Sequence, residues 1–126
     1  MRQIEYNKRM AKPCEMARLF VALGNETRLR LLNLMAEREI CVCELVEVLR
    51  LPQPKISQHL ACLRSVGIVC ARREGKWMHY RMVTPAHREA AQVLQATLAW
   101  MQTDKQMLAD RNRHGKSLCL TAIQQA

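Results

Sequence analysis

The chain has 126 residues, a length typical of a single domain, and its 20 Lys and Arg against 11 Asp and Glu give a net charge of +9. The resulting pI of about 9.7 predicts a nucleic-acid partner, because domains with a pI above about 9 are typical nucleic-acid binders. No apolar run approaches the roughly 18 to 20 residues of a membrane span, and residues 1–10 lack a signal-peptide hydrophobic region. We therefore expect a cytoplasmic protein with no membrane partner.

Two amphipathic helices are predicted near the start of the chain. The first has apolar residues at the i, i+3, i+4, i+7 spacing over residues 16–23 and ends at Gly24. The second is capped by Asn25, and its leucines face a core while Arg28 and Arg30 are expected to remain in water. The two helices therefore each have one face to bury.

The next two helices are predicted to form a helix-turn-helix pair. The third spans Cys41 to Leu49 and ends before Leu51-Pro52, because the residue before a proline is disfavoured in helical backbone. The fourth spans about 53–66 and stops at Gly67. In such a pair the second helix enters the major groove of DNA, so residues 53–66 are the predicted recognition helix.

A β-hairpin and one long helix follow. Residues 68–73 and 77–83 are β-rich and are separated by a turn in which Gly75 can supply the positive φ of a tight loop. This hairpin, residues 68–83, is the predicted wing. A helix over about 86–110 comes next, and residues 111–126 are expected to be a polar tail. The predicted fold is thus mainly α with a two-stranded β-hairpin, a winged helix-turn-helix in which residues 1–110 form one domain.

The polar side of the recognition helix supplies the candidate DNA contacts. If Ile56, Leu60 and Leu63 are its buried stripe, Gln58 lies opposite them and is the leading base-reading candidate, since Gln can pair bidentately with adenine. The other candidates on this helix and on the wing are Gln53, Lys55, Ser57, His59, Arg72, Arg73 and Lys76. His59 fits a boundary position in the core as well as it fits a phosphate contact.

Cys41 and Cys43 stand two positions apart at the start of the helix before the recognition helix. Thiolates select soft ions such as Zn²⁺, Cu⁺ and thiophilic As(III) or Sb(III), so the pair predicts a sensing site. Residues i and i+2 of a helix project about 200° apart, so both thiols meet one ion only if the first turn is distorted or lies outside the helix. The positive helix N-terminus is expected to lower the thiol pKa.

The other four cysteines are expected to be thiols as well, because a reducing cytosol disfavours a disulfide scaffold. Cys14 and Cys119 are the candidates for a third ligand, from the same or the opposite subunit, although an incidental role for either stays open, as does a site of two thiols with an exogenous third ligand. Cys62 and Cys70 are better explained by packing.

Four blocks of the sequence together resemble the ArsR/SmtB family of metal-responsive repressors, and within it the arsenic-type members. They are Ala22-Leu23-Gly24-Asn25-Glu26-Thr27-Arg28-Leu29, Cys41-Val42-Cys43-Glu44-Leu45, Gln53-Pro54-Lys55-Ile56-Ser57-Gln58-His59-Leu60 and Glu74-Gly75-Lys76-Trp77-Met78-His79-Tyr80-Arg81. One departure is Val46, which stands where many arsenic-type members carry a third cysteine.

The resemblance implies a homodimeric repressor of an arsenic-resistance operon, with helices at about 13–23 and 86–110 in the dimer interface. Such a repressor binds an imperfectly palindromic operator without a cofactor and is released when As(III) or Sb(III) binds Cys41 and Cys43. The alternatives are a redox- or persulfide-responsive or a Cd/Zn-responsive repressor of the same fold. An enzyme is not expected, because no phosphate loop, nucleophile elbow or zinc-protease motif is present.

Overall fold

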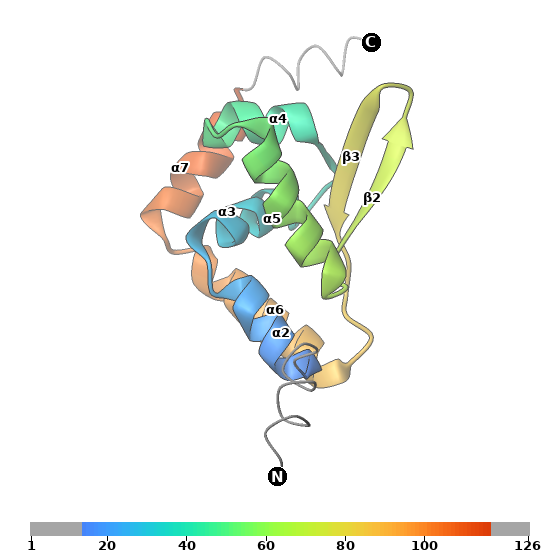
Figure 1. Ribbon diagram of the computed structural model, residues 1–126. Helices are drawn as coiled ribbons and strands as arrows, with labels where there is room; N and C mark the ends of the chain where they lie inside the picture. Colours follow the sequence, from blue (N-terminus) through green and yellow to red (C-terminus); the bar gives the residue numbers. More distant parts are fainter. Residues whose placement is uncertain (1–13, 117–126) are drawn as a thin grey trace.

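The computed structural model describes residues 14–116 as a helical body with a small antiparallel sheet projecting from one side (Figure 1). The winged helix-turn-helix prediction is confirmed. In chain order the elements are α2 (Glu15–Leu23), α3 (Glu26–Met35), β1 (Ile40–Cys41), α4 (Val42–Leu49), α5 (Gln53–Ser65), β2 (Val69–Glu74), β3 (Trp77–Met82), α6 (Arg88–Met101) and α7 (Lys105–His114). None of the helices in this part of the chain is both long and apolar enough to cross a bilayer.

The helix-turn-helix pair consists of α4 and α5, which pack against each other and against α3. The predicted stripe of α5 is correct, because Ile56, Leu60 and Leu63 are all fully buried. From α4, Leu45 and Val48 are fully buried in the same core. Burial of one complete face of each helix fixes α5 relative to α4, so a displacement of α4 is transmitted to the recognition helix.

The sheet has three strands in the order β1-β3-β2, whereas the sequence predicted a two-stranded hairpin. The hairpin of β2 and β3 closes with a two-residue loop at Gly75, whose φ of +60° requires the freedom of glycine. The additional strand, β1, pairs Ile40 with Tyr80 and Cys41 with His79. A strand of two residues is too short to show any periodicity, which is why the sequence placed Cys41 inside a helix.

The long helix expected over residues 86–110 is two helices, so that prediction was wrong after Met101. α6 ends at Met101, and Asp104 begins α7 by accepting a hydrogen bond from the Met107 N–H at 3.1 Å. Because a new cap starts at Asp104, α7 turns back and packs on α3 and α4 (Figure 1). Residues 111–114, expected in a polar tail, complete α7; the rest of that tail from residue 117 lies outside the described residues.

Polar side chains hold α7 in place. Arg30, which was expected to remain in water, donates to both carboxylate oxygens of Asp110 at 2.7 and 3.0 Å. The Asp110 side chain is fully buried and that of Arg30 is 17% exposed. Asn33 donates to the Met107 carbonyl oxygen at 2.9 Å, also out of water. Directional hydrogen bonds therefore help to fix the orientation of α7, together with the buried side chain of Met107.

Candidate nucleic-acid interface and thiol site

The outward face of α5 carries the polar side chains that the sequence predicted there. Gln53, Lys55, Ser57 and Gln58 are all exposed, and the first turn of the helix contains no acidic residue. A helix with exposed amide, hydroxyl and ammonium groups suits the major groove, where amides read base edges and cations contact phosphates. All four predicted residues are therefore accessible to solvent on the recognition helix.

His59 lies at the edge of this surface and is half-buried. Its Nδ1 is 3.2 Å from the guanidinium of Arg28, which was expected to remain in water. Arg28 instead also donates to the carbonyl oxygens of Ala22 at 2.8 Å and Val21 at 2.9 Å at the end of α2. Burial, followed by the positive charges of Arg28 and Lys55, lowers the pKa of His59. His59 therefore accepts from Arg28 as a neutral imidazole, which joins α2, α3 and α5.

The lowered pKa of His59 predicts a loss of stability in acid. The unfolded chain takes up the proton near the ordinary histidine value of about 6.5, whereas the folded chain resists it. We expect thermal unfolding at pH 7 and pH 5 to show a smaller drop in Tm for His59→Gln than for the parent, since Gln can still accept from Arg28. His87→Gln is the control, because the side chain of His87 is 67% exposed. Equal pH dependence in parent and His59→Gln would contradict this account.

The wing carries the predicted cations, but they differ in their surroundings. Arg72 forms ion pairs with Glu39 and Glu74, and its guanidinium lowers the pKa of the Glu39 carboxyl, so the first of these pairs is intact at neutral pH. Lys76 lies over the Trp77 ring, with Nζ 5.4 Å from the ring centroid. Arg73 is exposed and forms no ion pair within residues 14–116. Arg72 must therefore exchange a carboxylate for a phosphate if it binds DNA.

The two cysteine side chains at the start of α4 lie together, with their Sγ atoms 3.1 Å apart. Cys41 is a free cysteine, whereas Cys43 is disulfide-bonded, so the expectation that the cysteines are all thiols is wrong for Cys43. The sequence predicted that this would need a distorted first turn or a cysteine outside the helix, and the second arrangement is present. Cys41 has extended backbone angles, φ −73° and ψ 144°, as the N-cap of α4, and Cys43 is in its first turn. Once Cys43 is reduced, both sulfurs can therefore contact one soft ion without unwinding the helix.

The expected lowering of the thiol pKa is wrong for Cys41. Its side chain is fully buried, and this burial raises the pKa of the thiol more than nearby backbone N–H groups lower it. The Glu44 carboxylate raises the pKa further. Cys41 is consequently a protonated thiol at neutral pH, and an ion that binds its sulfur must displace the proton.

Glu44 and His114 form a buried polar pair next to the two cysteines, and this pair was not predicted from the sequence. Glu44 Oε1 accepts from the Cys41 backbone N–H at 3.1 Å, and Oε2 lies 2.8 Å from His114 Nε2. The two side chains are each 5% exposed. The Cys41-x-x-Glu44 spacing is that of a capping box, which was an available signal for Glu44, whereas nothing local marked His114. The end of α7 therefore lies beside the thiol pair.

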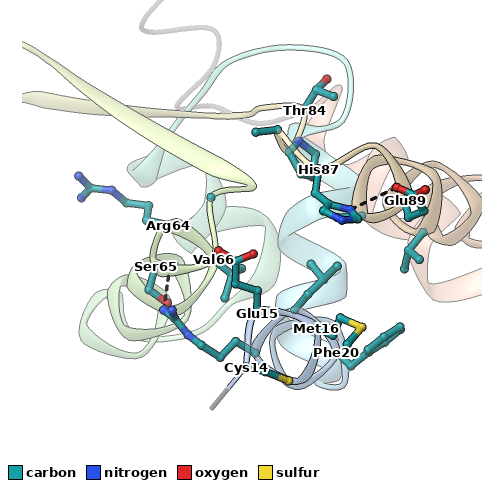
Figure 2. Close-up of a pocket in the computed structure, with 17 residues that line it drawn as sticks. Cys14, Glu15, Met16, Phe20, Arg64, Ser65, Val66, Thr84, His87 and Glu89 are labelled. Carbon is teal, nitrogen blue, oxygen red and sulfur yellow. Dashed lines mark hydrogen bonds and ion pairs between the residues drawn. The ribbon is translucent and has the colours of Figure 1, made fainter. Parts of the chain in front are cut away.

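The two candidate third ligands have different positions. Cys14 is the N-cap of α2, at the opposite end of the body from α4 (Figure 1). It lines a groove of about 1000 Å³ between α2, the end of α5 and the start of α6, together with Glu15, His87 and Glu89 (Figure 2). Cys14 is thus not a ligand of the thiol pair within one subunit. Cys119 lies outside the described residues, and within residues 14–116 no group of three or more Cys, His, Asp or Glu residues is arranged to hold a metal ion.

A helix-turn-helix pair with an exposed polar recognition helix and a basic hairpin beside it defines a winged-helix DNA-binding transcription regulator, not an enzyme. Residues 25–70 match the profile described as "Bacterial regulatory protein, arsR family". The chain is 41% identical over 108 residues to the arsenic resistance transcriptional regulator ArsR1 of Pseudomonas putida, covering 79% of this chain and 81% of that protein. It is 40% identical over 110 residues to the arsenical resistance operon repressor of Escherichia coli, covering 80% and 92%. The chain belongs to the ArsR family.

Solved structures agree with this assignment. The transcriptional repressor BigR of Xylella fastidiosa superposes with a TM-score of 0.56 at 34% identity, covering 79% of this chain and 96% of that one. A homodimeric winged helix-turn-helix domain from Mycobacterium bovis gives a TM-score of 0.58 at 31% identity, covering 70% and 79%. The arrangement of helices and wing is therefore shared with known regulators of this family.

Proposed function

We propose that this protein represses an arsenic-resistance operon and leaves its operator when As(III) or Sb(III) binds Cys41 and Cys43. The observation that carries the proposal is the 3.1 Å separation of the two sulfurs at the start of the first helix of the DNA-binding pair. The names of the Pseudomonas and Escherichia relatives, both of them arsenic-resistance regulators, support the choice of inducer. Binding to an operator would place the protein in the cytoplasm.

The raised pKa of the Cys41 thiol does not obstruct arsenite binding. Arsenous acid reacts with a thiol by forming one As–S bond, while one hydroxyl group leaves with the thiol proton as water. Two reduced thiols therefore release two waters, and no net proton is needed or freed. A soft, three-coordinate ion of this kind is better suited to neutral buried thiols than a cation that requires thiolates.

Of the two candidates for a third thiol we propose Cys119. His114 contacts Glu44, which in turn caps Cys41, so the described chain leaves α7 beside the thiol pair. Cys119 follows His114 by five residues, which can span up to about 17 Å when extended. Cys14 would have to come from the partner subunit, because it lies at the far end of its own.

Ion binding would alter DNA binding through α4. Cys41 and Cys43 belong to the cap and first turn of this helix, and its buried face packs on α5. If closing the thiols around an ion changes the start of α4, the recognition helix shifts with it, and the ion binds the DNA-free form more tightly. Coupling of this kind is reciprocal and typically amounts to about 1–3 kcal/mol.

On the operator, Gln58 and Ser57 are the proposed base contacts, and the flanking cations and polar groups are proposed to bind phosphates. The latter group consists of Gln53, Lys55, His59, Arg72, Arg73 and Lys76. A two-fold dimer would place its two recognition helices in successive major grooves, so the operator is expected to be an imperfect palindrome with half-sites about one helical turn apart.

The proposed homodimer would form through α2 and α6. Large apolar side chains on these helices are exposed, with Met16 72%, Phe20 56% and Trp100 80% exposed. Exposed apolar groups of this size mark interaction surfaces, and the Mycobacterium bovis neighbour is homodimeric. The groove of Figure 2 lies at one end of this surface, with Met16 and Phe20 on its wall.

We expect Trp100→Glu to convert the dimer into a monomer of 14.6 kDa in light scattering, because two copies would bury like charges against each other. Operator affinity should fall with it, since a monomer contacts one half-site. Leu108→Glu is the matched control, because Leu108 is a half-exposed residue on α7 outside the proposed surface. A Trp100→Glu variant that stays dimeric would remove α6 from the interface.

The test of the repressor function is the fluorescence anisotropy of a labelled promoter fragment, with the full chain kept reduced. The complex would be titrated with arsenite, antimonite, zinc, cadmium and, separately, hydrogen peroxide. The proposal is supported if arsenite or antimonite releases the promoter fragment at concentrations where zinc and cadmium do not. Release by peroxide alone, reversed by dithiothreitol, would make the thiols a redox sensor, and release by zinc or cadmium alone would change the inducer.

A further inference from the structure

The turn between α4 and α5 contains an unusual backbone residue. Arg50 ends α4 with φ 56° and ψ 42°, and its N–H donates to the Val46 carbonyl oxygen at 2.9 Å. It is the single non-glycine residue with positive φ in the part of the chain that the structure describes, whereas the other two positive-φ positions there are Gly67 and Gly75. A side chain is disfavoured in this left-handed conformation, so Gly or Asn usually ends a helix in this way.

Nothing in the described fold uses the guanidinium of Arg50. Its side chain is exposed and takes part in no hydrogen bond or ion pair within residues 14–116, unlike Arg28, Arg30 and Arg72. Apart from the backbone hydrogen bond to Val46, no polar contact of the Arg50 side chain within residues 14–116 offsets the cost of its backbone conformation. Positions with such backbone angles cluster at functional sites.

The position of Arg50 indicates what the guanidinium contacts. It is followed by Leu51 and then Pro52, the N-cap of α5, so it lies immediately before the recognition helix. The first turn of α5 presents Gln53 and Lys55 to solvent, with no carboxylate to pair with the arginine. An arginine at the entrance of a helix that lies in the major groove is placed to meet the phosphates at the groove edge.

We propose that Arg50 binds a DNA phosphate beside the major groove, and that this contact is the reason for an arginine at a position suited to glycine. The proposal rests on operator binding by the helix-turn-helix pair. It adds to the interface a residue that helix and wing patterns do not indicate, because Arg50 belongs to neither element.

The test compares Arg50→Gly, Arg50→Asn and Arg50→Lys with the parent by operator binding over 50 to 200 mM salt and by thermal unfolding. Loss of one phosphate per subunit lowers the slope of log affinity against log salt by about 0.9, or about 1.8 for a dimer. The advantage of the parent over Arg50→Gly should therefore shrink roughly tenfold across this salt range. Arg50→Lys should keep the parental slope.

The stability measurement separates a DNA contact from a structural role. Gly and Asn accept the left-handed conformation, so Arg50→Gly and Arg50→Asn should have a Tm equal to or above that of the parent while binding more weakly. Lys105→Gln, which removes an exposed cation at the start of α7, should leave the salt slope unchanged. An unchanged slope in Arg50→Gly, or weaker binding that accompanies a lower Tm, would overturn the proposal. Failure of the parent to bind any promoter fragment would instead count against the proposed function.

Discussion

Cys41→Ser and Cys43→Ser should each bind the operator as the parent does but remain bound when arsenite is added. Removing one sulfur of the pair breaks the closest contact that an ion can bridge, and the coupling of about 1–3 kcal/mol, or 5- to 150-fold in affinity, should disappear with it. Serine is a favourable N-cap residue, so Cys41→Ser should retain the start of α4 and the parental Tm. The measurement is an arsenite titration of the protein–operator complex by anisotropy.

Three further serine variants complete this experiment. Cys70→Ser, in β2, is the matched control and should respond to arsenite like the parent. Comparison of Cys14→Ser with Cys119→Ser identifies the third ligand, and we expect only the second to weaken the response. Normal arsenite release from Cys41→Ser would exclude the thiol pair as the inducer site, whereas loss of the response in Cys14→Ser would indicate a site shared between subunits.

Asp110→Ala should destabilise the protein more than any other single change to α7. The carboxylate is fully buried and accepts from Arg30 and, at 2.9 Å, from Gln106. Without it the guanidinium of Arg30, which is largely out of water, loses the carboxylate to which it is hydrogen-bonded and keeps only the weaker influence of Glu26. Leaving one half of a buried ion pair typically costs about 3–5 kcal/mol, which urea denaturation at fixed protein concentration would measure.

Two companion variants identify the cause of that loss. Asp110→Asn keeps an acceptor for Arg30 without the charge and should lose less stability than Asp110→Ala. Arg30→Met with Asp110→Leu removes both charges together and should recover much of the stability, because the pair is replaced by apolar packing. If Asp110→Ala unfolds within about 1 kcal/mol of the parent, the ion pair is not what holds α7, since that is the scale of an exposed pair.

The helix-turn-helix pair was predictable because its signals are local. The spacing of Ile56, Leu60 and Leu63 identifies the buried face of α5, and Gly75 marks the hairpin loop. The cap at Asn25 was also correct, with its side chain accepting from the Arg28 N–H at 3.0 Å. Each of these features depends on residues within a few positions of one another.

The parts that the sequence did not reveal depend on distant residues. β1 exists only because β3 lies beside it, and no local pattern marks two residues as a strand. The polar residues before Asp104 are compatible with a continuing helix, so the sequence did not indicate the break there. The break allows α7 to pack on α3, where Asp110 binds Arg30, a residue 80 positions away in the sequence. The proximity of the two sulfurs had the same origin, because pairing of Cys41 with β3 keeps it out of the helix.

The register of β1 gives the sensing residue a second mechanical connection. Cys41 is paired with His79 in β3, the middle strand of the sheet, and is also the N-cap residue of α4. A displacement of Cys41 is therefore expected to move both the hairpin, through β3, and the recognition helix, through α4. β1 is attached to the sheet by only two residues. We therefore expect substitutions that destabilise the wing to change the arsenite concentration that releases the operator, even where operator affinity is preserved.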